Sequence, residues 1–145
     1  MTPIIGNSAS QIALLAKAQW GYPERWTEIW TPLLTITPEF ISSADVRTSE
    51  ANSELAGFYA LIFVKQRASL EHLWILPAYI GQGIGRALFE HALARCRDMR
   101  CQGLEIVSDP NARGFYERMG AKKVGVSIGE MDGDLRSLTV IEIIW

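Results

Sequence analysis

The sequence predicts a mixed domain of the α/β (α+β) class, in which one sheet carries helices on both faces. The chain has 145 residues, which is the usual size of a single domain. Along the chain, predicted helices come first and a strand hairpin follows. A strand–helix–strand–helix segment comes next, and two strands end the order. Because each helix must bury its apolar stripe, this order favours a sheet between helical layers.

The composition is that of an ordinary globular protein, with 48% hydrophobic and 21% charged residues. The net charge of -2 lacks the basic excess of nucleic-acid-binding domains, so no nucleic-acid partner is expected. Cys96 and Cys101 do not have the spacing of a zinc site, and no metal is expected. No apolar run is long enough to span a membrane, and the first residues do not resemble a signal peptide. We therefore expect a cytoplasmic protein without a membrane partner.

The first third of the chain is predicted to be mostly helical. Thr2–Ile5 is a possible short strand, and Gln11–Gln19 is predicted as a helix. In the next predicted helix, Glu24–Leu34, apolar residues recur at the spacing of one helical face. Thr37–Glu39 combines a cap, a first-turn proline and an acidic residue, which predicts one more helical turn. Ala44–Thr48 is predicted as an edge strand.

The middle of the chain contains the strongest strand prediction. Leu55–Val64 is continuously apolar, as is typical of a central strand buried on both faces. A short polar break predicts a hairpin into a second strand, Leu70–Leu76. From Gly83 to Arg100, apolar and charged residues separate onto opposite faces, which predicts a long helix packed flat on the sheet.

The last third is predicted to continue the alternation. Leu104–Val107 is predicted as a short buried strand, and Asp109–Asn111 as a turn. Ala112–Met119 is predicted as a helix closed by a glycine. Lys123–Ser127 and Leu138–Trp145 are predicted as further strands joined by a polar loop.

Three glycines between the Leu70 strand and the long helix indicate an anion site. Gly81, Gly83 and Gly85 follow Pro77 and are spaced two residues apart. Glycine tolerates positive φ and lets a backbone approach a ligand closely. The helix that follows offers free N–H groups and the positive end of its dipole, which together suit phosphate. The spacing matches neither the dinucleotide-binding fingerprint nor the P-loop.

Two segments carry a family resemblance. Leu73–Pro77, followed by Gly81–Leu88, resembles the acyl-CoA-binding motif of the GNAT superfamily of N-acetyltransferases. Asp109–Ala121 resembles the second motif of that superfamily, in the expected order. The resemblance implies one acetyltransferase domain over residues 1–145. Its sheet would be central, mixed, mostly antiparallel and twisted, with about six to seven strands and helices on both faces.

The resemblance also implies a set of site residues that would bind acetyl-CoA as co-substrate. The backbone of Leu73, Trp74 and Ile75 would bond the acetyl carbonyl and the pantetheine arm. Tyr116 would protonate the leaving thiolate, with Phe115 packed nearby. The amides that would cradle the pyrophosphate belong to Ile80, Gly81, Gln82, Gly83, Ile84, Gly85 and Arg86.

Two positions depart from the superfamily pattern. Ile80 stands where the superfamily usually has Gln or Arg. Asp109 stands where it frequently has Asn, and Asn111 is the neighbouring residue that would take over the contact with CoA. Backbone amides do most of the cradling, so CoA binding is expected to survive the change at position 80.

Acetyl transfer to an amine also needs a general base, for which three residues are candidates. Glu71 and His72 are neighbours on a predicted strand and should point to opposite faces, so at most one of them reaches the acceptor. The ordinary pKa of histidine suits a base, yet we assign the role to Glu71. Glu105 is the third candidate. Each of them has the alternative of being an ordinary polar residue on a strand.

Aromatic residues near the N-terminus fall where the superfamily builds its acceptor pocket. We assign Trp20 and Tyr22 to acceptor binding, whereas Trp26 and Trp30 fit the buried face of a helix slightly better than the pocket. Such rings bind a cationic amine by cation–π contact. The expected function is direct transfer of an acetyl group to a primary amine of a small molecule. The alternatives are transfer to a protein or peptide amine, and a non-catalytic acyl-CoA-binding module.

The exposed strand edges and the apolar segment Val140–Trp145 make a homodimer plausible, because an unpaired strand edge is a template for pairing with another chain.

Overall fold

The computed structural model describes residues 12–17, 21–22, 25–26, 28, 37–108, 112–131 and 134–144. The predicted strand at Thr2–Ile5 and the predicted turn at Asp109–Asn111 lie outside the described residues. Residues 12–17 are helical and fall inside the predicted helix Gln11–Gln19. Among the described residues, no helix has the length and hydropathy needed to cross a membrane.

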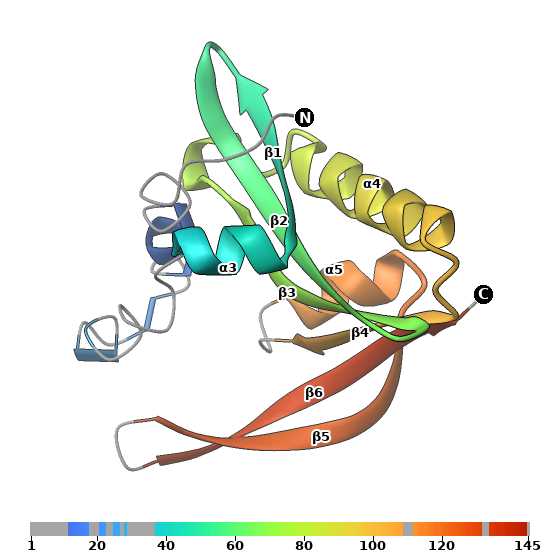
Figure 1. Ribbon diagram of the computed structural model, residues 1–145. Coiled ribbons are helices and arrows are strands. Elements are labelled where there is room, and N and C mark those ends of the chain that lie inside the picture. The colour runs from blue at the N-terminus through green and yellow to red at the C-terminus, as the bar shows by residue number, and fades with distance from the viewer. Residues whose placement is uncertain are drawn as a thin grey trace.

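One twisted sheet forms the centre of the described part of the chain (Figure 1). Its strand order is β1-β2-β3-β4-β6-β5, and only the β3–β4 pair is parallel. The prediction of a mixed, mostly antiparallel sheet is therefore confirmed. The strands are β1 (Asp45–Ala51), β2 (Glu54–Val64), β3 (Arg67–Ile75), β4 (Gly103–Ser108), β5 (Lys122–Met131) and β6 (Asp134–Ile144).

Strands β3 and β4 pair only where they begin. The parallel register runs from Arg67 opposite Gly103 to Ser69 opposite Glu105. Beyond this point β3 continues beside β2 as far as Ile75, and β4 continues beside β6. Figure 1 shows the sheet opening between them. The second half of β3 therefore has a backbone edge without a ladder partner on the β4 side, among the strands that the structure describes.

A β-bulge in β3 changes which way its side chains point. Ala60 of β2 is opposite His72, whereas Leu61 is opposite Leu70, so Glu71 is an extra residue in β3. Before the bulge, the even-numbered residues Ala68 and Leu70 point to one face of the sheet. After the bulge, odd-numbered residues of β3 point to that same face. The prediction from simple alternation, that Glu71 and His72 point to opposite faces, is wrong for this reason.

Helices α4 (Ile84–Asp98) and α5 (Arg113–Arg118) cover one face of the sheet (Figure 1). The inward stripe of α4 consists of Leu88, Phe89, Ala92, Leu93 and Cys96. These side chains pack on Tyr59 and Leu61 of β2 and on Leu104 of β4. The prediction of a long amphipathic helix on the sheet is confirmed within two residues at each end.

The opposite face of β1, β2 and β3 carries α3 (Pro38–Ser43) and the helical residues 12–17 (Figure 1). Thr37 caps α3 as predicted, because its side-chain oxygen accepts a hydrogen bond from the Phe40 amide at 3.1 Å. Ile12, Ala13 and Phe58 meet in the core on this side. The prediction of helices on both faces is confirmed.

The β5–β6 hairpin is longer than predicted. The predicted strands Lys123–Ser127 and Leu138–Trp145 lie within or overlap β5 and β6, which extend to Met131 and from Asp134. The polar residues predicted as a loop are thus mostly strand. Their register, with Met131 opposite Asp134, makes the connection as short as a hairpin allows.

Candidate active site

A cavity of about 420 Å³ lies at the end of β3 that has no β4 partner. It is bounded by the helical residues 12–17, the last residues of β3, the glycine turn, and the first turns of α4 and α5. Its lining consists of Ala16, Leu73, Trp74, Ile75, Tyr79, Ile80, Gly81, Gly83, Gly85, Arg86, Ala112, Phe115, Tyr116 and Arg118. Most of the residues predicted from the sequence to hold acetyl-CoA are therefore brought together in one space.

The glycine turn has the backbone geometry that the sequence predicts. Gly81 and Gly83 have φ of +84° and +82°, a left-handed conformation that strains any residue with a Cβ. A Cβ at either position would meet nothing within 4 Å, so conformation and not crowding requires glycine there. Gly83 caps α4, and the Ala87 amide closes the first helical bond to the Gly83 carbonyl at 3.0 Å. The backbone amides between Gly83 and Ala87 are the first N–H groups of α4, and such groups suit an anion.

Two residues of the predicted cradle do not line the cavity with their side chains. Gln82 turns back and donates a hydrogen bond from Nε2 to the Ala78 carbonyl at 3.3 Å. Ile84 packs against the core under α4. Only their backbone amides can therefore serve an anion. Ile80 lines the cavity and is 51% exposed, so the departure at this position places an apolar side chain at the rim.

The short helical turn η1 (Pro77–Tyr79) joins β3 to the glycines and is anchored to the β1–β2 turn. Tyr79 is buried, and its hydroxyl bonds a carboxylate oxygen of Glu54 and the Ala51 carbonyl. The turn between them includes Asn52, which has positive φ. No sequence pattern indicated this anchor, because the two partners belong to distant segments.

The end of β3 is held closely against β2. A Cβ on Gly57 would lie 2.7 Å from the Trp74 carbonyl oxygen and 2.7 Å from Cδ1 of Ile75. The Leu76 amide also bonds the Ala56 carbonyl at 2.8 Å. Glycine at position 57 thus lets the cavity-lining end of β3 approach its neighbour more closely than any other residue would permit.

Tyr116 is placed in the cavity wall by α5. It is 6% exposed, and its ring packs edge-on against Phe89 of α4 and Phe115, with centroids 5.5 and 5.2 Å apart. Burial raises the pKa of Tyr116 above its usual range. The phenol therefore keeps its proton at neutral pH and is available as a donor. Asn111, the predicted neighbouring contact, lies outside the described residues.

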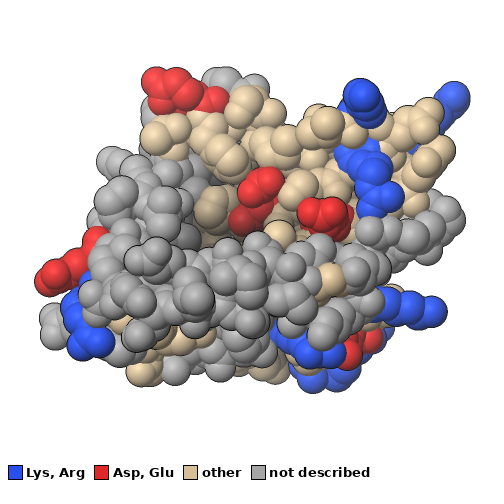
Figure 2. Space-filling view, turned by 90° about the horizontal axis from the view of Figure 1, so that it is seen from below, with Lys and Arg blue, Asp and Glu red and all other residues tan. Residues whose placement is uncertain are grey.

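Glu71 is exposed at the bulge of β3 and accepts a hydrogen bond from Ser69 Oγ at 3.0 Å. Ala68 and Leu70 both face α4. Ser69 lies between them and therefore faces the α3 side, and its hydrogen bond places the Glu71 carboxylate on the same side. Glu105 of β4 is exposed and in register with Ser69. Figure 2 shows acidic side chains gathered near the middle of the face seen from below, where the surface is hollowed.

His72 is part of the core on the α3 side. Its ring packs edge-on against Phe40 at 5.6 Å, and its Nδ1 accepts a hydrogen bond from Trp74 Nε1 at 3.0 Å. Burial, with a smaller effect of the Lys17 ammonium, lowers the pKa of His72 to about 4. The ring is neutral at physiological pH, and because Nδ1 is the acceptor the proton sits on Nε2. His72 cannot accept a proton from an amine without losing the Trp74 bond.

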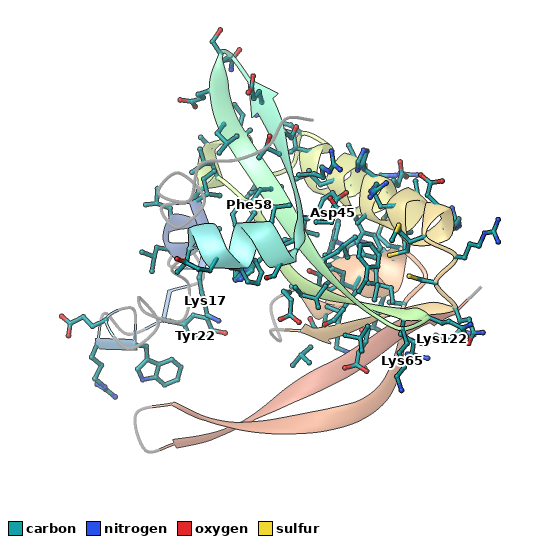
Figure 3. All side chains as sticks on the ribbon, viewed as in Figure 1. Lys17, Tyr22, Asp45, Phe58, Lys65 and Lys122 are labelled. Carbon is teal, nitrogen blue, oxygen red and sulfur yellow. The ribbon has the colours of Figure 1, made fainter. Side chains whose placement is uncertain are left out.

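The predicted acceptor residues are described only in part. Trp20 and Trp30 lie outside the described residues. Tyr22 is half-buried and stacks on Trp26 at 5.5 Å, without appearing in the described cavity lining. A contact that the sequence did not indicate is Lys17, whose Nζ lies 5.9 Å from the centroid of the Trp74 ring. Figure 3 shows Lys17 and Tyr22 on the α3 side of the sheet, away from Asp45 under α4.

Within the described residues, no three His, Cys, Asp or Glu side chains come together as a metal site. Cys96 and Cys101 are both buried thiols. Burial raises the pKa of Cys96 to about 12, so this thiol is not a nucleophile at neutral pH. Neither cysteine lines the cavity.

Comparisons with known proteins agree with this geometry. A Bacillus subtilis protein assigned as a ribosomal protein bS18-alanine N-acetyltransferase is 34% identical over 80 residues, which is 53% of each chain. The chain thus spans about half the length of this relative. A GCN5-related N-acetyltransferase structure from Rhodopseudomonas palustris has a TM-score of 0.82 at 14% identity, and covers 99% of this chain and 94% of its own.

A second solved structure shares the fold. It is the PaiA N-acetyltransferase of Thermoplasma acidophilum in complex with coenzyme A, with a TM-score of 0.76 at 18% identity, covering 96% of this chain and 92% of its own. The family model of the GNAT acetyltransferases matches residues 12–121, which include the glycine turn, the open edge of β3 and Tyr116. The chain belongs to the GNAT acetyltransferase family.

Proposed function

We propose that the protein is an N-acetyltransferase that moves an acetyl group from acetyl-CoA directly to a primary amine. The observation that carries this proposal is the single cavity of about 420 Å³ that joins the open edge of β3, the glycine turn and Tyr116. An elongated thioester with a pyrophosphate at one end needs these three features in one continuous space. The coenzyme A complex of the Thermoplasma acidophilum relative supports the same ligand.

The residues fit acetyl-CoA by their chemistry. The amides between Ile80 and Arg86 would hold the pyrophosphate at the start of α4. The backbone of Leu73, Trp74 and Ile75 would pair with the pantetheine arm, since this edge has no described strand beside it. A strand amide near Ile75 would also polarise the thioester carbonyl as negative charge develops on its oxygen.

Tyr116 would stabilise the leaving thiolate by donating its phenol proton. A raised pKa makes the phenol a weaker acid, but the same burial also raises the pKa of the thiol beside it. The pKa values of the two groups therefore remain matched inside the cavity. No covalent enzyme intermediate is proposed, because neither cysteine lines the cavity.

For the general base we propose Glu71, with Glu105 as the alternative. Both carboxylates are exposed on the α3 side near the point where β3 and β4 separate. A protonated amine is attracted to such an acidic surface before it loses its proton. The bond between Trp74 and Nδ1 of His72 argues against the imidazole.

For the acceptor we propose a primary amine of a small molecule, held near Tyr22 and Trp74. The name of the Bacillus subtilis relative supports a second candidate, the N-terminal amine of a protein. Mass spectrometry after incubation with acetyl-CoA and matched sets of small amines and short peptides would separate the two. Acetylation confined to peptides would replace the small-molecule proposal.

A further inference from the structure

The segment that leads from β3 to α4 is held to the body of the protein by one buried side chain. Residues 77–83 comprise η1 and the glycine turn, and the structure describes all of them. Tyr79 is 6% exposed, whereas each of the other residues in this segment is exposed. Because Gly81 and Gly83 leave the backbone many conformations, the order of the segment depends on such a contact.

The backbone hydrogen bonds described for this segment are local. The Tyr79 amide bonds the Leu76 carbonyl at 2.9 Å, and the Ile80 amide bonds the Pro77 carbonyl at 3.3 Å. Bonds of this span close a helical turn, but they do not fix the position of that turn relative to the rest of the sheet. The long-range contacts are made by the Tyr79 side chain.

The hydroxyl of Tyr79 reaches the β1–β2 turn. It donates a hydrogen bond to a carboxylate oxygen of Glu54, and the Ala51 carbonyl lies 3.3 Å away as a second acceptor. Ala51 and Glu54 are paired across a two-residue turn, in which Asn52 and Ser53 both have positive φ. Positive φ at both central residues is typical of a tight hairpin, so both acceptors belong to one compact turn.

The bond to Glu54 is the stronger of the two, because a hydroxyl has one proton and a carboxylate is the better acceptor. This hydrogen bond also raises the pKa of Tyr79 above its usual range, so the phenol remains a donor at neutral pH. Glu54 is exposed and does not line the cavity, whereas Tyr79 does. An effect of Glu54 on a ligand would therefore pass through Tyr79. The contact is called the Tyr79–Glu54 anchor below.

We propose that Glu54 is a positioning residue for coenzyme A, because it holds Tyr79 and thereby fixes the glycine turn in the conformation that receives the pyrophosphate. A turn that is ordered before binding costs less free energy to order in the complex, so the anchor raises the affinity. The inference rests on the proposed use of acetyl-CoA. It assigns a role in binding to the β1–β2 turn, which supplies no residue to the described cavity lining.

Titration calorimetry with coenzyme A tests the proposal. Glu54→Ala and Tyr79→Phe should each weaken binding about five- to tenfold, as the loss of one part-buried hydrogen bond to a carboxylate predicts. Glu54→Gln retains an acceptor and should lie between Glu54→Ala and the wild type. Electrostatics alone predicts the opposite sign, because removing a carboxylate favours an anionic ligand. Unchanged or tighter binding by Glu54→Ala would overturn the inference.

The double variant Tyr79→Phe/Glu54→Ala shows whether the two groups act as one unit. It should bind coenzyme A within about twofold of Tyr79→Phe alone, because the same contact is lost in both. Additive losses would show that the two side chains act separately and would contradict the anchor.

Steady-state kinetics separates positioning from catalysis. The KM for acetyl-CoA should rise in Glu54→Ala, while kcat and the KM for the amine stay within about twofold, since Tyr116 and the end of β3 are unchanged. A fall in kcat with no change in the KM for acetyl-CoA would contradict a positioning role.

Tyr59→Phe is the matched control for a general loss of packing. Tyr59 is fully buried, its hydroxyl bonds Nδ1 of His91 at 2.7 Å, and it lies outside the cavity lining. This variant should be less stable to urea but bind coenzyme A within about twofold of the wild type. An affinity loss as large as that of Tyr79→Phe would overturn the inference and leave the proposed function standing. Failure of the wild type to bind coenzyme A at all would instead refute the proposed function.

Discussion

At the scale of single residues, Tyr116 owes its burial to two neighbours. Phe89 and Phe115 enclose its ring and leave it 6% exposed. The local motif identified Tyr116 from the sequence, but its burial depends on Phe89 of another helix. The direction of its pKa shift could therefore be derived only from the structure.

Removing the phenol oxygen should separate catalysis from binding. Tyr116→Phe should lower kcat by about 10²-fold or more, because a proton donor to the leaving group is lost. The ring packing is kept, so the affinity for coenzyme A should stay within about twofold. Steady-state kinetics and calorimetry measure the two quantities. An unchanged kcat would remove Tyr116 from the reaction.

The two exposed carboxylates beside the open edge of β3 can be distinguished by matched variants. Glu71→Gln should lower kcat/KM by about 10²-fold, as loss of a general base does. Glu105→Gln should retain most of the activity. The reverse pattern in the two variants would transfer the role of base to Glu105.

At the scale of elements, β3 determines the site, and its two irregular features could not be predicted. The bulge at Glu71 and the early end of the β3–β4 pairing are defined by partners on other strands. Hydrophobic alternation along one segment contains no information about either. By contrast, α4 was predicted almost to its ends, because its signals of apolar stripe and glycine cap are local.

The close contact between β2 and the end of β3 predicts a sensitive glycine. Gly57→Ala places a Cβ against the Trp74 carbonyl and should lower the free energy of unfolding by about 1–3 kcal/mol. Affinity for coenzyme A should fall with it, because Trp74 lines the cavity. Gly114→Ala is the control, since its Cβ meets only the end of Arg118 at 3.4 Å. Urea unfolding of both variants checks this, and equal stability of the two would contradict it.

The packing of α3 on β3 predicts a pH dependence of stability. The pKa of His72 is about 4 in the folded protein and 6.5 as the ordinary value. The unfolded chain binds this proton first, so the stability is fully present above pH 6.5 and falls as the pH drops from 6.5 to 4. The loss from this group approaches about 3 kcal/mol.

The variant His72→Gln tests this directly. Glutamine keeps an acceptor for Trp74 Nε1 but does not titrate, so stability should decline less steeply between pH 6.5 and 4 than in the wild type. His91→Gln is the comparison, since His91 bonds the Tyr59 hydroxyl on the other face of the sheet. Denaturant unfolding at several pH values measures both slopes. Identical slopes for His72→Gln and the wild type would contradict the account.

At the scale of the whole molecule, the class and the layers of the fold were predicted from the sequence. A continuously apolar strand, an amphipathic helix and a capped helical turn each predicted an element that the structure contains. The predicted lengths of β5 and β6 were wrong, because polar residues of these strands were interpreted as a loop. Pairing along the full hairpin supplies backbone hydrogen bonds that composition alone does not reveal.

The candidate site was likewise predicted only in part from the sequence. Most residues that line the cavity were found by motif, because the glycines and the tyrosine occur at fixed spacings along the chain. The anchor from Tyr79 to Glu54 and the contact of Lys17 with Trp74 were not found. Each of them joins segments that only the folded sheet brings together.

The central claim is direct acetyl transfer in the cavity that joins β3, the glycine turn and Tyr116. The most direct measurement combines thiol release from acetyl-CoA with mass spectrometry of a panel of small amines and peptides. The account predicts that thiol appears only when an acceptor is present, in an amount equal to the acetylated amine. Binding of acetyl-CoA without acetylation of any acceptor, or thiol release that leaves the acetyl group on the protein, would contradict it.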